Sequence, residues 1–172
     1  MLVLFFLFGL AVHDLTTHHK AAPAASPPAS GGLRTGLQAP AGRVGASFSL
    51  DEGSGNTYQV TLVKVIDPAS TPGSGKRIVG LVFRIKGTGG TLHSEDADRD
   101  AVVVGANGQD YQSDFKALNG YGHFDAGAIQ LSAGQTVTGA VAVPVPDRVT
   151  VSTIQWTALS QNGPMVEWIV QT

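Results

Sequence analysis

The clearest pattern in the chain is a short-range alternation of apolar and polar residues. Residues 76–86 place Val79, Leu81, Phe83 and Ile85 on one side and charged residues on the other. A period of two is typical of a β-strand with one buried face. We therefore expect the strongest strand of the domain here, with those four side chains in the core.

The stretch 129–151 combines a turn, an alternating strand and a proline-rich corner. Residues 136–143 alternate, and Pro144 and Pro146 follow directly. Proline has no N–H to donate to a sheet. The strand must therefore end at these prolines or lie at the edge of a sheet.

Other runs have the same character, and no long segment has a helical period. Asn107-Gly108 lies between two short runs and is typical of a β-hairpin. The run that reaches Trp156 changes side partway, which predicts a β-bulge or burial on both faces. Together these patterns predict an all-β fold, an antiparallel β-sandwich of about 7–9 strands. The additional strand-like runs are 44–50, 58–66, 101–105, 109–115, 149–156 and 165–170.

The chain begins with a different kind of sequence. Residues 1–12 are an almost continuous apolar run, long enough for an export signal and too short to span a bilayer as a helix. No basic residue precedes the run and His13-Asp14-Leu15 is a poor cleavage site, so the remainder of a truncated anchor is an alternative to an export signal. A buried strand or helix of the domain is a third alternative. Residues 13–42 are rich in Ala, Pro, Ser and Gly, which predicts a disordered linker.

This organisation predicts a domain at 43–172 that lies outside the cytoplasm, either extracellular or membrane-anchored. Membrane contact is expected only through the N-terminal segment. The formal net charge of -2 gives no basic patch for nucleic acid. The chain has no cysteine, which excludes disulfides, thiolate metal sites and cysteine nucleophiles.

Several turn and strand signatures of the chain occur together: Asp67-Pro68, the 105–111 hairpin, the 131–135 turn, the 139–146 strand and Trp168. The chain is similar to the telokin-like, immunoglobulin-fold domains of unknown function found in exported actinobacterial proteins, which include small secreted antigens. The resemblance covers roughly residues 43–172 and implies an immunoglobulin-like fold and an exported setting, with no catalytic residues to carry over.

The chain departs from that family in two respects. Gly87-Thr88-Gly89 stands where an asparagine is common after the third strand. The lipid-attachment cysteine of many members is missing, so a lipoprotein anchor is not expected.

The acidic segment 95–100 is the main concentration of oxygen ligands. Asp96, Asp98 and Asp100 alternate, and such carboxylates can bind calcium. An ordinary solvated loop is the alternative, because the full calcium-loop motif is absent. His93 and His123 could meet each other or this segment and bind zinc or copper, or they could be solvated spacers.

Aromatic residues are densest in the loop 117–127, which we expect to cover one end of the sandwich. Tyr121, His123 and Phe124, with Tyr111 and Phe115 on the preceding hairpin, could form an exposed patch that binds a protein or a glycan, or they could fill the end of the core. Trp156 lies in a strand-like run, as does the later tryptophan, and both are expected in the core.

The sequence predicts neither an enzyme nor a cofactor. A Gly-x-Ser-x-Gly motif is absent, and no pair of carboxylates can be placed across a cleft. The leading hypothesis is a non-catalytic exported or cell-surface binding module, with an unknown protein or cell-envelope partner. The alternative is an extracellular carrier of a small ligand or metal, with calcium at 95–100 or zinc or copper at the histidines.

Overall fold

The structure, a computed structural model, describes residues 39–124 and 128–170, with the side chains of residues 91–94 and 128 excepted. These residues belong to one compact unit, Leu37–Thr172. The predicted export segment 1–12 and nearly all of the linker 13–42 lie outside the described residues. Within the two described ranges, no helix is long and apolar enough to cross a membrane.

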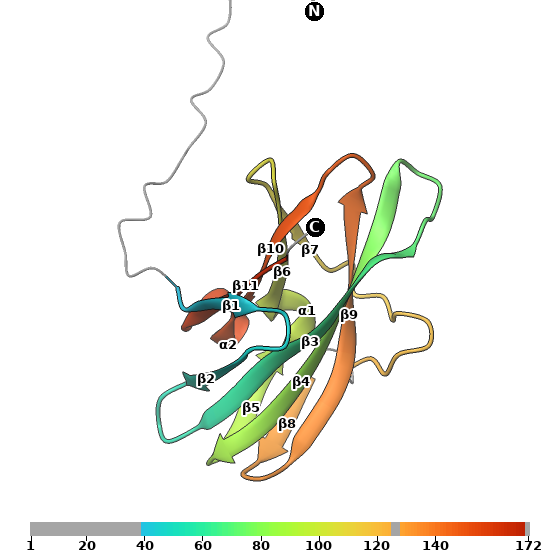
Figure 1. The fold of residues 1–172 in the computed structure, drawn as a ribbon. Coiled ribbons are helices and arrows are strands. Elements are labelled where there is room, and N and C mark those ends of the chain that lie inside the picture. Colours follow the sequence, from blue (N-terminus) through green and yellow to red (C-terminus); the bar gives the residue numbers. More distant parts are fainter. Residues whose placement is uncertain (1–38, 125–127, 171–172) are drawn as a thin grey trace, which may run out of the picture. The chain divides into compact units, whose positions relative to one another are not determined.

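The described residues form eleven strands and two single-turn helices (Figure 1). The count exceeds the predicted 7–9 strands partly because the run 44–50 is shortened by a turn and residues 128–132 pair as a strand of their own. The elements are β1 (Ala41–Arg43), β2 (Ser47–Asp51), β3 (Thr57–Ser70), β4 (Lys76–Gly89), β5 (Thr91–Asp96), α1 (Ala97–Asp100), β6 (Ala101–Gly105), β7 (Asp110–Gln112), β8 (Ala128–Ser132), β9 (Thr136–Pro146), β10 (Val151–Thr157), α2 (Ala158–Gln161) and β11 (Met165–Ile169).

The strands build an all-β sandwich, as predicted. One sheet has the order β1-β11-β10-β6-β7 and the facing sheet the order β2-β3-β4-β9. A two-stranded sheet of β5 and β8 completes the fold. All pairs are antiparallel except β1, which runs parallel to β11.

The alternate apolar side chains of β4 form one wall of the core. Val79, Leu81, Phe83 and Ile85 are each 0% exposed, which confirms the prediction for this strand. β4 pairs with β3 on one side and with β9 on the other, so its backbone groups bond to both neighbours. A central strand with one fully apolar face anchors the sheet over the core.

The centre of the core is aromatic and joins the two large sheets. The ring of Phe83 from β4 lies edge-on to Trp156 of β10, with 4.9 Å between centroids, and to Trp168 of β11 at 5.8 Å. Such edge-to-face pairs contribute about 0.5–1.5 kcal/mol beyond the area that they bury. The Trp168 indole N–H donates to the carbonyl of Ala46, so burying its polar edge leaves nothing unsatisfied.

The two prolines take one of the two predicted forms, because the strand continues through both of them and lies at the edge of its sheet. β9 is the edge strand of its sheet and carries both Pro144 and Pro146, opposite Ile78 and Lys76 of β4. Only one side of an edge strand needs donors, so the missing N–H groups are tolerated. Further along, the register of β10 against β6 shifts after Val151, which confirms the expected bulge.

The segment after β7 does not cap an end of the sandwich, as the sequence had led us to expect. Residues 113–124 instead run along β9: Leu118 packs on Val82, Ala140 and Ala142, and Phe124 is buried in the main core. The prediction was wrong because Ala140 and Ala142 form an apolar surface on the face of β9 that points away from the main core. Residues 113–124 pack on that surface through Leu118.

Candidate functional site

The acidic segment forms the end of β5 and the short helix α1. Asp96 is the N-cap of α1, and its Oδ1 atom accepts a hydrogen bond from the Asp98 backbone N–H at 3.2 Å. Its other oxygen lies 3.3 Å from the Arg99 guanidinium. This is a standard capping role, which uses the carboxylate to satisfy a free helix N–H group.

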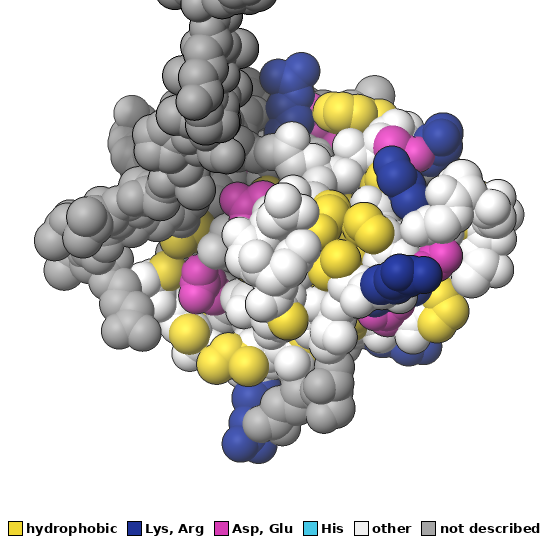
Figure 2. All heavy atoms as spheres, turned by 90° about the horizontal axis from the view of Figure 1, so that it is seen from above, with side chains coloured by type: hydrophobic (Ala, Val, Ile, Leu, Met, Phe, Trp, Pro, Cys, Tyr) yellow, Lys and Arg dark blue, Asp and Glu magenta, His cyan; other side chains and the backbone are white. Residues whose placement is uncertain are grey.

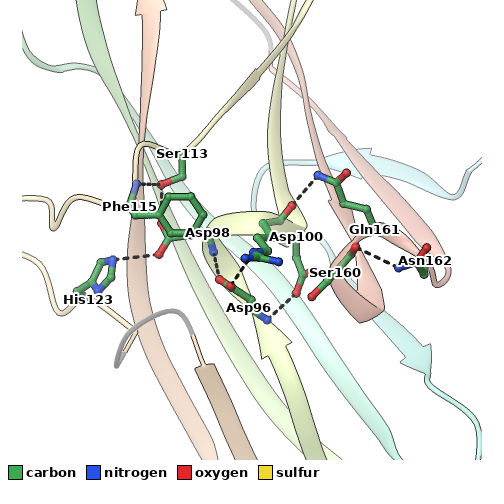
Figure 3. A network of polar contacts seen from close by, with 10 residues as sticks. Asp96, Asp98, Asp100, Ser113, Phe115, His123, Ser160, Gln161 and Asn162 are labelled. Carbon is green, nitrogen blue, oxygen red and sulfur yellow. Dashed lines mark hydrogen bonds and ion pairs between the residues drawn. The ribbon is translucent and has the colours of Figure 1, made fainter.

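Asp98 has different partners and is only 2% exposed. The Ser113 hydroxyl donates to its Oδ1 atom at 2.5 Å, and the Nε2 atom of His123 lies 3.2 Å from its Oδ2 atom (Figure 3). The Phe115 backbone N–H in turn donates to the Ser113 hydroxyl at 3.0 Å. The contacts of Asp98 with Ser113 and His123 thus hold the 113–124 segment against α1.

Asp100 faces the interior and is 0% exposed. Its Oδ2 atom accepts a hydrogen bond from the Asp96 backbone N–H at 3.1 Å, and its carboxyl lies beside that of Glu95. Asp96, Asp98 and Asp100 therefore contact different neighbours. The predicted calcium loop draws no support from this geometry.

A transition-metal site also remains only a prediction. His123 reaches the acidic segment as anticipated, but only through Asp98. The His93 side chain is not among those described. Across residues 39–124 and 128–170, no group of three His, Asp or Glu side chains is arranged to hold a metal ion.

The contact of Ser113, Asp98 and His123 brings together the residue types of a hydrolase triad, but in the wrong order. A nucleophilic serine needs a histidine within hydrogen-bond reach as its general base. Here the carboxylate of Asp98 stands between the two and binds the serine hydroxyl directly. A hydroxyl that donates to a carboxylate in this way is held in place, and the imidazole contacts the carboxylate rather than the hydroxyl.

A second polar cluster, which the sequence did not predict, lies directly beneath α1. Glu95 is 0% exposed, and its carboxyl lies beside those of Glu52 and Asp100. Its Oε1 atom also accepts hydrogen bonds from the Leu159 N–H at 3.0 Å and the Tyr58 hydroxyl at 3.4 Å. We call Glu52, Glu95 and Asp100 the carboxyl cluster.

The carboxyl cluster retains protons at neutral pH. Burial, followed by the hydrogen bond and the charge of Glu95, raises the pKa of Glu52 to about 8 and that of Asp100 to about 10. One buried oxygen on each of the three carboxyls receives no N–H or protein hydroxyl. Protons shared between the carboxyls would satisfy these oxygens, as buried polar atoms require.

The cluster connects the aromatic core to a strained turn. The Trp156 indole N–H donates to the Tyr58 hydroxyl at 2.9 Å, and that hydroxyl contacts Glu95. Burial raises the pKa of Tyr58, so its hydroxyl keeps its proton. This hydrogen-bonded path continues from Glu95 to the backbone of Leu159.

The turn has an unusual backbone. Leu159, Ser160 and Gln161 have φ values of 55°, 50° and 75°, in the left-handed region, and none of them is glycine. The left-handed conformation costs about 1–2 kcal/mol for each such residue. The Gln161 side chain secures the turn by donating to the Arg99 carbonyl at 2.9 Å.

A groove of about 360 Å³ opens between this turn, α1 and the end of β7. We call this region, comprising α1, α2 and residues 112–115, the α1–α2 end. Phe115 lines the groove, is 56% exposed and also has a left-handed backbone, with φ of 59°. Non-glycine residues held in such conformations concentrate at binding and active sites.

The predicted aromatic patch is divided by the structure. Phe124 is 3% exposed and its ring packs directly over Gly139, where a Cβ atom would lie 3.0 Å from the ring atoms. Tyr121 is 40% exposed, and His123 is half-buried against Asp98. The exposed aromatic surface of this segment therefore comes from Tyr121 and from Phe115, which lies in the same aromatic-rich part of the sequence.

Sequence patterns contained little signal for these features. Glu95 and Asp100 occur in an acidic run, which usually indicates a solvated surface. Leu159, Ser160 and Gln161 carry no glycine or asparagine to indicate left-handed backbone. The exposure of Phe115 depends on the path of residues 113–124, which no local pattern determines.

Comparisons with known proteins support the fold. No protein-family model and no curated protein sequence matches the chain. The solved structure of MPT63, a secreted protein from Mycobacterium tuberculosis, matches with a TM-score of 0.58 and 12% identity, over 78% of this chain and 100% of that one. YcdA from Bacillus subtilis, named a "putative lipoprotein", matches with a TM-score of 0.50 and 12% identity, over 75% of this chain and 38% of that one. At this level of identity, the shared property is the β-sandwich fold.

Proposed function

We propose that this chain is a non-catalytic binding module acting outside the cytoplasm, and that the α1–α2 end binds a protein of the cell exterior. The observation that carries the proposal is the groove lined by three left-handed, non-glycine residues, Phe115, Ser160 and Gln161, of which Phe115 is 56% exposed. Exposed aromatic side chains on a rigid support are typical of interface hot spots.

The location outside the cytoplasm draws on two further observations. The apolar run 1–12 and the linker 13–42 have the composition of an export segment and a tether. The chain also shares its fold with a secreted protein and with a "putative lipoprotein". Membership of the telokin-like family belongs to the same proposal.

The non-catalytic part of the proposal rests on the polar network. The hydroxyl of Ser113 and the imidazole of His123 each meet Asp98 rather than one another. The carboxyl cluster lies beneath the turn, with Glu95 and Asp100 fully buried, so these acids do not face the groove. Binding through shape and aromatic contact is the role that these groups support.

Site-specific photo-crosslinking tests the proposal. A photoreactive phenylalanine replaces Phe115 in the full chain, expressed in the cells that naturally produce it. The matched control carries the same group at Val63, another exposed apolar residue, on β3. We expect a discrete protein adduct from position 115 and none from position 63.

A competition experiment tests whether the crosslinked adduct reflects specific binding. Excess unmodified protein should suppress the adduct, whereas excess protein carrying Phe115→Ser should not, since its groove lacks the aromatic contact. Identical adducts from both positions, or none from position 115, would reject the α1–α2 end as the binding surface.

A further inference from the structure

The sheet that contains β4 and β9 has a second apolar face, opposite the main core. Val82, Ala140 and Ala142 are each 7% exposed or less, and Leu118 from the 113–124 segment packs on them. A Cβ atom at Gly80 would lie 2.6 Å from Leu118, so the absent side chain lets the segment lie close to β4. An outward face of an antiparallel sheet is usually polar, so this face is adapted to be covered.

The 113–124 segment covers this apolar face only in part. Beside Leu118, between residues 114–119 and the turn of the β3–β4 hairpin, lies a cavity of about 530 Å³. Ile78 and Ala142 line it together with Pro144 of the edge strand. Sites for small molecules typically enclose about 300–1,000 Å³, mostly with apolar walls and a few polar groups.

The charged groups around this cavity carry an excess of positive charge. Lys76, Lys116 and Asp114 line it. The Lys116 ammonium lies 2.8 Å from the Asp114 carboxylate, so these two charges balance. Lys76 forms no ion pair with any described residue, and its ammonium is available to an anion.

Figure 2 shows the face of the domain seen from above, where the β3–β4 hairpin turns. Hydrophobic side chains gather near the centre of this face, and Lys or Arg side chains lie beside them together with Asp or Glu side chains. This combination favours a ligand with an apolar body and one negative charge. A nucleic acid or a highly charged polyanion does not match the apolar walls.

We propose that this cavity binds a small single-chain anionic amphiphile, an aliphatic carboxylate, with its chain along Ile78 and Ala142 and its carboxylate at Lys76. The site is separate from the groove at the α1–α2 end: Phe115 lines that groove, whereas its neighbours Asp114 and Lys116 line the cavity. The inference does not depend on the proposed protein partner. It assigns a second ligand, of a different class.

Calorimetric titration of the purified full chain with decanoate tests the proposal, with decanol as the uncharged control. We expect saturable binding of one decanoate and weaker binding of decanol. Lys76→Gln should weaken decanoate binding about ten-fold, because a charge-assisted contact is lost, and should leave decanol binding unchanged. Ala117→Trp, at an exposed residue that lines the cavity, should weaken binding of both ligands by filling the space.

Lys64→Gln is the matched control, because Lys64 is an exposed lysine beside another apolar groove, which Val63 and Val65 line. It should change neither affinity. Thermal unfolding checks that each variant remains folded. Equal affinities for decanoate and decanol, an equal loss in Lys64→Gln, or no saturable decanoate binding would each overturn the proposal.

Discussion

The aromatic core and the α1–α2 end show two different ways of using buried polar groups. In the core, the Trp168 indole donates to the Ala46 carbonyl, and the neighbouring side chains are apolar. At the α1–α2 end, Glu95 and Asp100 are equally buried but lie against another carboxyl, and the adjoining backbone is left-handed. Apolar packing dominates in the core, whereas the α1–α2 end contributes Ala97 and Ala158 to that core and also maintains a costly left-handed turn.

The largest effect is expected in the core. Trp156→Ala should lower the free energy of unfolding by about 3–5 kcal/mol, because it removes the ring that packs on Phe83 and leaves a cavity. Urea denaturation measures the change. Tyr121→Ala, at a partly exposed aromatic residue, should cost less than about 1 kcal/mol. Similar losses in the two variants would contradict the assignment of Trp156 to the centre of the core.

Glu95→Ala should have the next largest effect, about 2 kcal/mol, because the Leu159 N–H and the Tyr58 hydroxyl lose their acceptor in the interior. Glu167→Ala is the control, since this half-buried carboxylate on β11 bonds to Gln155, and we expect a loss below about 1 kcal/mol. The same denaturation assay applies. An unchanged free energy of unfolding in Glu95→Ala would mean that Glu95 does not stabilise the turn.

The carboxyl cluster also predicts the direction of pH dependence. Glu52 and Asp100 bind protons more tightly in the folded chain, with pKa values of about 8 and about 10, than at their ordinary values of 4.5 and 3.8. The resulting stabilisation is complete below the ordinary values and is lost as the pH rises toward the folded-state values. The free energy of unfolding should therefore decrease from about pH 6 to about pH 9.

Denaturation at the two pH values measures this decrease. Glu95→Gln should reduce it, because a neutral amide removes the charge of Glu95 that helps to raise both pKa values. A free energy of unfolding that is constant or increases over this range in the unmodified chain would exclude a protonated cluster.

The smallest effect should be a gain in stability. Ser160→Gly should raise the free energy of unfolding by about 0.5–1 kcal/mol, because glycine adopts the left-handed conformation without steric cost. Ser49→Gly, at an exposed position of β2, should instead lower it by a similar amount of about 0.5–1 kcal/mol. Thermal unfolding resolves the two opposite signs. A loss in both variants would indicate that the turn is not strained.

How far the sequence predicts the structure also differs between the two regions. The alternation of residues 76–86 was enough to place Phe83 and its neighbours in the core, because a strand with one buried face has a period of two. The two prolines of β9 correctly indicated an edge strand, since they cannot donate to a neighbouring strand on both sides. Local sequence patterns are sufficient to predict a strand and its buried face where the alternation of the strand itself determines which side chains are buried.

The α1–α2 end could not be predicted in this way. Its contacts join residues far apart in the chain, such as Glu95 with Leu159 and Asp98 with Ser113. The acidic run indicated a cluster of carboxylates, but whether these converge on a cation or on one another depends on tertiary packing. The left-handed turn is imposed by the tertiary structure on residues that ordinarily avoid it.

Native-state hydrogen exchange compares the two regions most directly, because the central claim is that the α1–α2 end is a strained structure beside a stable core. At neutral pH, the amides of residues 158–163 should exchange through local openings of lower free energy than those of β10, and the difference should grow as the pH rises and the carboxyl cluster loses protons. Equal opening free energies for the turn and β10 at every pH would contradict the account.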